Sequence, residues 1–127
     1  MRSKNMSLTS ADRVEINELV SRYNQAIDSG NGPVWASTFT QDGTFHSGSG
    51  QAAGTDELSD FASGFTEKMP GTRHWVNNLV IDGDESEAQL CCYLNLMRGG
   101  DVLASLTYND TLVKQDGAWK FKSRTVS

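Results

Sequence analysis

The chain of 127 residues has few cysteines and histidines, the side chains that close disulfides and bind zinc, with only two of each. Cys91 and Cys92 are sequence neighbours, and His46 and His74 lie far apart, so no metal-ligand spacing is present. Neighbours in a strand point to opposite faces, so a disulfide between the cysteines would be strained. We therefore expect two buried core thiols and no bound metal.

Basic residues and long apolar runs are also scarce. The chain has 11 lysines and arginines against 16 aspartates and glutamates, a formal net charge of −5. Without a basic run it lacks the surface that binds nucleic-acid phosphates. No stretch approaches the roughly 20 apolar residues of a membrane helix, and residues 1–5 lack the apolar continuation of a signal peptide. We expect a cytoplasmic protein that binds neither nucleic acid nor membranes.

The first half of the chain has helical periodicity. Thr9 and Asp12 have the spacing of a capping box at a helix start. Apolar residues then recur at three- and four-residue intervals, which predicts one buried stripe. They are Ile16, Leu19, Val20, Tyr23 and Ile27. The Ser-Gly-Asn-Gly segment at residues 29–32 is expected to end this helix.

Two shorter helices are expected next. Pro33 suits the first turn of a short second helix, which Asp-Gly at residues 42–43 closes into a turn. The glycine-rich residues 48–54 predict a loop. Thr55 is expected to cap a third helix, and Pro70 followed by glycine stops it.

From Thr72 onward the period becomes alternating, which predicts strands. Turn signals at residues 82–84, 99–101 and 115–117 divide this half into four long strands joined as antiparallel hairpins. Helices followed by a strand meander are typical of an α+β fold. We expect one α+β domain over residues 9–127, after a flexible tail, in which three N-terminal helices pack on a strongly curved, mainly antiparallel sheet around an apolar pocket.

The first hairpin predicts which side chains share a face. If Gly83 and Asp84 are the central turn residues, paired residues have numbers that sum to 167, which places His74 opposite Tyr93. Directly paired residues lie on one face. The expected pocket face holds His74, Val76, Asn78, Cys91, Tyr93, Asn95 and Met97. A single β-bulge would reverse this assignment.

The other face of these two strands is expected to be apolar. It would carry Trp75, Leu79, Leu94 and Leu96. Such a patch is larger than monomers usually expose, which predicts a homodimer through this face.

His74 is the candidate for acid–base chemistry, since an ionisable histidine near a carboxylate can transfer protons at neutral pH. Asp28, at the end of the first helix, is the nearest helix-borne carboxylate candidate. The alternatives are a structural histidine at a sheet edge and a solvated aspartate at a helix end.

Several segments together resemble the NTF2-like superfamily, over almost the whole chain. They are the helix with Tyr23 and Asp28, the segment from Trp35 to Phe45, the strand Thr72-Arg73-His74 with Asn78, and the segments 108–110 and 116–121. The chain is most similar to SnoaL-like and scytalone-dehydratase-like members, whose number includes dehydratases, isomerases and polyketide cyclases.

The resemblance implies a working pair of Asp28 and His74, with Tyr23 as a further catalytic group. The family's additional ionisable residue one strand on falls near Asn95 or Met97, where this chain has none. The family's amide donor near the final hairpin falls near Tyr108, where this chain has a hydroxyl.

The remaining candidate pocket residues are aromatic or polar. Trp35, Phe61 and Phe65 suit both the core and the pocket lining, and His46 suits the pocket mouth. Asn78, Tyr93 and Asn95 either bind a ligand or satisfy each other. We expect a cofactor-independent lyase or isomerase acting on a small, largely apolar carbonyl- or hydroxyl-bearing substrate, with Tyr23 and Asn95 holding the oxyanion. The alternative is a non-catalytic ligand-binding or dimeric assembly domain.

Overall fold

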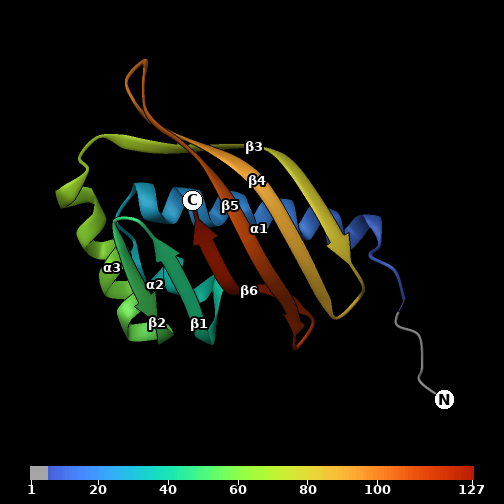
Figure 1. The fold of residues 1–127 in the computed structure, drawn as a ribbon. Coiled ribbons are helices and arrows are strands. Elements are labelled where there is room, and N and C mark those ends of the chain that lie inside the picture. Colours follow the sequence, from blue (N-terminus) through green and yellow to red (C-terminus); the bar gives the residue numbers. More distant parts are fainter. Residues whose placement is uncertain (1–5) are drawn as a thin grey trace.

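The computed structural model describes residues 6–127 and has one sheet with three helices on one side of it (Figure 1). The helices are α1 (Ser10–Asp28), α2 (Gly32–Ser37) and α3 (Gly54–Lys68). The strands are β1 (Phe39–Ser47), β2 (Gly50–Ala53), β3 (Thr72–Gly83), β4 (Glu87–Arg98), β5 (Asp101–Gln115) and β6 (Ala118–Val126). The α+β class is therefore confirmed, although α3 follows the β1–β2 hairpin and is not continuous with the first two helices.

The expected start of α1 is present. The Thr9 side chain accepts a hydrogen bond from the Asp12 backbone N–H, and the Asp12 carboxylate accepts one from the Thr9 N–H, which is a complete capping box. The whole apolar stripe is buried against the sheet. After Asp28 the chain leaves the helix at Gly30, which has a φ of 70°.

Three local expectations in the following segment are wrong. Residues 42–43 do not close α2 in a turn, because β1 begins at Phe39 and runs through them. Residues 48–54 are not all loop, since β2 pairs with β1 in a hairpin. Thr55 does not cap α3: the N-cap is Ala53, whose backbone N–H donates to the Glu57 carboxylate.

The sheet is mixed and open, with the strand order β2-β1-β6-β5-β4-β3. The four long strands form the expected antiparallel meander, while β1 pairs with β6 in parallel. β2 and β3 remain at the edges, and the twisted sheet is not as strongly curved as was expected (Figure 1).

The predicted register of β3 and β4 is wrong. The turn is longer than two residues, since Gly83 pairs with Ala88, and His74 lies opposite Leu96 rather than Tyr93. A bulge between Asn77 and Val80 shifts the pairing once more. The two faces of β4 are therefore exchanged relative to the prediction, as a one-residue slip suffices to do, whereas His74 and Val76 of β3 stay on the helix-facing side as expected.

The helix-facing side of the sheet is the apolar one. Leu79, Leu94 and Leu96 are packed inside and do not form an outer patch. The cysteines follow the same alternation: Cys92 is buried as expected, whereas Cys91 is exposed. Within residues 6–127, no helix is long and apolar enough to span a membrane.

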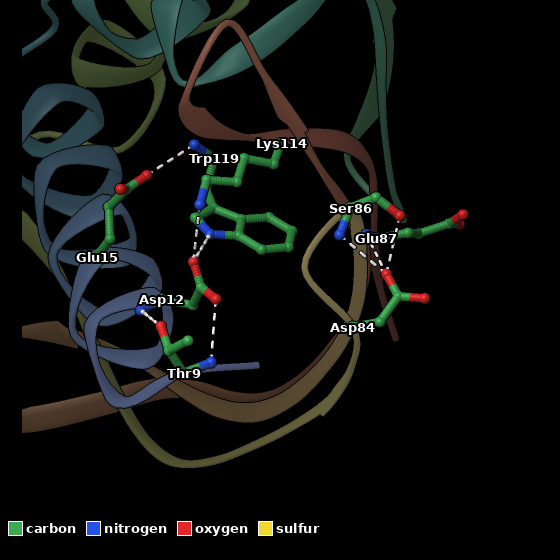
Figure 2. Close-up of polar contacts among 8 residues, drawn as sticks. All are labelled: Thr9, Asp12, Glu15, Asp84, Ser86, Glu87, Lys114 and Trp119. Carbon is green, nitrogen blue, oxygen red and sulfur yellow. Dashed lines mark hydrogen bonds and ion pairs between the residues drawn. The ribbon is translucent and has the colours of Figure 1, made fainter. Parts of the chain in front are cut away.

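One end of the molecule is held by a polar cluster (Figure 2). The Asp12 carboxylate accepts from the Trp119 indole Nε1 and from Lys114 Nζ, both at 3.1 Å, and the Glu15 carboxylate accepts from the Trp119 backbone N–H at 2.7 Å. These contacts attach the start of α1 to the β5–β6 hairpin. Of the expected tail, residues 1–5 lie outside the described part, and Ser7 forms a bridge with Asp84 at the β3–β4 turn.

Candidate active site

Asp28 and His74 meet where the end of α1 approaches the start of β3. His74 Nδ1 lies 2.7 Å from Asp28 Oδ1. The same carboxylate accepts the backbone N–H of His74, at 3.0 Å from Oδ1 and 3.2 Å from Oδ2. The side chains are only 6% (His74) and 19% (Asp28) exposed. Asp28 therefore fixes both the strand and the imidazole ring.

This geometry defines which ring nitrogen of His74 is available for chemistry. An ionised carboxylate only accepts hydrogen bonds, so the proton of the neutral imidazole is on Nδ1 and the lone pair is on Nε2. Nε2 has no hydrogen-bond partner among residues 6–127. A carboxylate that orients Nδ1–H also stabilises the imidazolium that forms when Nε2 takes a proton.

An apolar cavity of about 490 Å³ lies close to this pair, between α3, the β1–β2 turn and the inner faces of β4, β5 and β6. Its apolar wall consists of Phe61, Phe65, Met69, Leu96, Ala104, Leu106 and Val126. Its polar lining is Ser47, Ser49 and Lys68, with Gly48 and Ser127 completing the boundary.

His74 adjoins the wall of this cavity. The rings of Phe65 and His74 have centroids 5.3 Å apart, and Leu96 is the cross-strand partner of His74. Both neighbours line the cavity, whereas His74 itself is not among the residues that line it. On the outer side, Asp28 lines an open groove together with Gln25, Ser29 and Arg73.

Phe61 and Phe65, both predicted as pocket residues, line the cavity. Trp35 is fully buried beneath Phe61, with the two rings stacked at a centroid distance of 5.6 Å. Its indole Nε1 has no partner in the described chain. Trp35 therefore supports the floor of the cavity from behind.

Tyr23 and Tyr108 lie in the core, beside each other and away from the cavity lining. Burial raises the pKa of the Tyr23 phenol, and hydrogen bonding to Tyr108 and the charge of Arg124 only partly oppose this. Burial likewise raises the pKa of Tyr108 well above its usual value. Both phenols are neutral at physiological pH, so they can donate hydrogen bonds but cannot act as bases.

Five predicted pocket residues lie elsewhere. Because of the corrected register, Tyr93, Asn95 and Met97 are on the outer face of the sheet, and Asn78 sits in the bulge with a φ of 57°. His46 is exposed on β1, on the opposite side of the strand from the buried Phe45. The expected oxyanion contact from Asn95 is therefore ruled out by its position.

The sequence did not predict the buried ion pair between Arg124 and Asp110. Arg124 Nε and Nη2 donate to the two carboxylate oxygens of Asp110 at 2.8 and 2.9 Å, and both side chains are fully enclosed. The guanidinium carbon lies 3.6 Å from the Tyr108 ring centroid and 4.5 Å from that of Tyr23. Arg124 Nη1 is unpartnered in the described structure.

Simple alternation could not have found Arg124. The pattern of Trp119 and Phe121 would place Ser123 inside and Arg124 outside, but pairing with β5 shifts between Thr111 and Leu112 and reverses the order. As for other ligands, the part of the chain from residue 6 to 127 contains no group of three or more His, Cys, Asp or Glu side chains able to hold a metal ion.

Several solved structures have a fold similar to that of this chain. A protein of unknown function with a cystatin-like fold from Nostoc punctiforme is 28% identical with a TM-score of 0.89, over 95% of this chain and 93% of the other. A candidate scytalone dehydratase from Novosphingobium aromaticivorans is 26% identical with a TM-score of 0.78, over 91% of this chain and 83% of the other. LinA is 22% identical with a TM-score of 0.81, over 92% of this chain and 85% of the other. At this level of identity the similarity shows the fold alone.

At the level of sequence, no curated protein matches the chain. Residues 9–125, nearly the full length, match the SnoaL-like domain. Together with the cystatin-like, NTF2-like neighbours, this confirms the resemblance inferred from the residues. The chain belongs to the SnoaL-like domain family.

Proposed function

We propose that this protein is an acid–base enzyme of the lyase or isomerase type, which uses His74 without a cofactor on a small, largely apolar carbonyl compound. The observation that carries the proposal is the 2.7 Å contact between Asp28 Oδ1 and His74 Nδ1 beside an apolar cavity. It leaves Nε2 of His74 without a hydrogen-bond partner among residues 6–127 and able to act as a base.

The reaction needs only proton transfer. Nε2 removes a proton from the carbon next to a carbonyl, and Asp28 stabilises the resulting imidazolium. The imidazolium then returns the proton to a departing hydroxyl, which gives dehydration, or to another carbon, which gives isomerisation. In ring closure the deprotonated carbon attacks a second carbonyl of the substrate, and the proton goes to the oxygen of that carbonyl. Whether the substrate carries a leaving hydroxyl, a mobile double bond or a second carbonyl decides between a dehydratase, an isomerase and a cyclase.

The proposal is tested by deuterium exchange at the carbon next to the carbonyl of 2-tetralone, followed by NMR in D₂O. We expect His74→Ala to lower the enzyme-catalysed exchange by about 10²-fold or more, the usual contribution of a general base. Asp28→Asn should lower it less, because the imidazole remains but its orienting charge is lost.

His46→Ala is the matched control, since it removes the other histidine of the chain from an exposed site outside the cavity. Its exchange rate should equal that of wild type. Near wild-type exchange by both His74→Ala and Asp28→Asn, with folding confirmed by circular dichroism, would refute the acid–base pair.

A second candidate is a non-catalytic small-molecule binder. It is favoured by the absence of His74, Tyr23 and Asn95 from the residues that line the cavity. A binder would take up 2-tetralone equally well in the wild type and in His74→Ala and catalyse no exchange in either.

We also propose that the outer face of the sheet forms a homodimer. Trp75, Val80 and Tyr93 are 67%, 61% and 53% exposed there. Trp75 pairs with Asn95 and Asn77 with Tyr93, so Trp75 and Tyr93 are diagonal neighbours on the same face of the sheet. Isolated chains seldom leave such aromatic groups in water together.

A further inference from the structure

The lining of the 490 Å³ cavity is mostly apolar and has a few polar side chains. Seven of its residues are apolar, Gly48 has no side chain, and the polar side chains are the hydroxyls of Ser47, Ser49 and Ser127 and the ammonium of Lys68. No Asp or Glu side chain lines the cavity. Among the described residues of the lining, Lys68 therefore has the only charged side chain, and it is positive on a chain with a net charge of −5.

Lys68 has no partner that would explain its place. Among residues 6–127 it forms no hydrogen bond or ion pair, and the α3 positions three and four residues before it are Phe65 and Gly64. By contrast, Lys114 binds the Asp12 carboxylate and Lys120 binds the Ser37 carbonyl. The ammonium group of Lys68 is free to meet a ligand.

The end of α3 accounts for part of this arrangement. Lys68 is the last residue of the helix, where the macrodipole favours a cation. That preference explains a positive charge at the helix end but is satisfied by any direction of the side chain. It does not explain why the residue lines the mouth of an apolar cavity.

Ser47 and Ser49, at the β1–β2 turn, add a hydrogen-bond donor at the mouth of the cavity. Ser47 Oγ donates to the Gly50 carbonyl and lies 2.9 Å from Ser49 Oγ. With its own proton committed to Gly50, Ser47 accepts the proton of Ser49 when the cavity is empty. The Ser49 hydroxyl can instead turn its proton to an anionic oxygen.

We infer that the ligand of this cavity is an amphiphilic carboxylate, whose anionic end binds Lys68 and Ser49 and whose apolar body lies against Phe61, Phe65 and Leu96. The inference rests on the proposed function, because it takes this cavity as the substrate site. Anchoring the carboxylate at the mouth directs the apolar body toward the wall that adjoins His74, which fixes the orientation of the substrate.

The test compares two probes of the same shape, 2-naphthoate and the neutral naphthalene-2-methanol, by isothermal titration calorimetry at pH 7. We expect wild type to bind the carboxylate about three- to tenfold more tightly, as a partly exposed ion pair allows. Lys68→Met should abolish this preference while leaving the affinity for the alcohol unchanged. Lys68→Arg should retain it, and added salt should weaken it in wild type.

Lys122→Met is the matched control, because Lys122 is an exposed lysine on β6 that lines none of the cavities described above. It makes the same change in net charge and should keep the preference for the carboxylate. Equal affinity of wild type for both probes, an unchanged preference in Lys68→Met, or no binding of either probe would each overturn the inference.

These outcomes are separate from those of the acid–base proposal, since binding is measured without turnover. Loss of the preference in Lys68→Met together with unchanged exchange in His74→Ala and Asp28→Asn would support the ligand class and refute the chemistry. The reverse pattern would retain the chemistry and refute the carboxylate.

Discussion

At the scale of single residues, the Asp12 carboxylate combines a helix cap with contacts to another element. It completes the cap of α1 and also accepts from Trp119 and Lys114. The backbone hydrogen bond from Thr9 and the side-chain bond from Trp119 hold the pKa of Asp12 well below its usual range. A carboxyl with a lowered folded-state pKa stabilises the fold above its unfolded pKa, and this stabilisation is lost as the pH falls below about 4.

We predict that Asp12→Asn lowers the free energy of unfolding by about 1–3 kcal/mol at pH 7, because charge-assisted hydrogen bonds and the helix cap are weakened. The difference from wild type should shrink as the pH falls from about 4 toward 2. Urea denaturation across this pH range measures it. Asp116→Asn, at an exposed turn position, is the control and should change little; a difference for Asp12→Asn that is independent of pH would contradict the assignment.

At the scale of elements, the turns set the strand register and thereby decide which side chains reach the cavity. Gly83 and Gly117 both have positive φ, 144° and 78°, but in different surroundings. A Cβ at Gly83 would lie 2.3 Å from the Glu87 carbonyl oxygen and 2.7 Å from Ala88 Cα, whereas one at Gly117 would meet nothing within 4 Å. Gly83 is therefore required by space as well as by conformation.

We predict that Gly117→Ala costs about 1 kcal/mol of stability through backbone strain alone, and that Gly83→Ala costs more than about 2 kcal/mol because the backbone must also move. Urea denaturation of the two variants gives the comparison, with Gly117→Ala as the matched control for strain. Equal losses would show that the close approach at Gly83 relaxes freely.

At the scale of the whole molecule, the outer sheet face is the surface proposed for dimerisation. Trp75 is exposed on this face as expected, but the leucines expected beside it pack inside, and the other exposed side chains are Val80 and Tyr93. We predict a dimer at micromolar concentration by light scattering, and a monomer for Trp75→Glu, because a charge in an apolar interface is costly to bury.

Val14→Glu is the control for this prediction. Val14 is 67% exposed on α1, as exposed as Trp75, but it lies on a helix rather than on the sheet face. This variant should remain dimeric. A wild-type protein that is monomeric at tens of micromolar would contradict the proposed interface.

Local signals in the sequence determined α1 and the division of the second half of the chain into four long strands. The capping box at Thr9 and Asp12, the apolar stripe of α1 and the alternation of the strands depend on neighbouring residues, so periodicity was enough to predict them, whereas β2 and the exact turns were not predicted. The family resemblance, which combines several such segments in order, also followed from the sequence.

Only the tertiary structure decided which residues meet. In β4, the side chains that face the helices depended on the length of the β3–β4 turn and on one bulge, and in β6 they depended on a shift in the pairing with β5. Asn95 therefore lies outside and Arg124 inside, the reverse of what the sequence pattern indicated. The contact of Asp28 with His74 joins residues 46 positions apart. The sequence offered Asp28 as a candidate carboxylate for His74, and only the resemblance implied that the two form a pair. Periodicity fixes alternation along a strand, but its phase relative to the core is set by packing between strands and helices, which no local pattern contains.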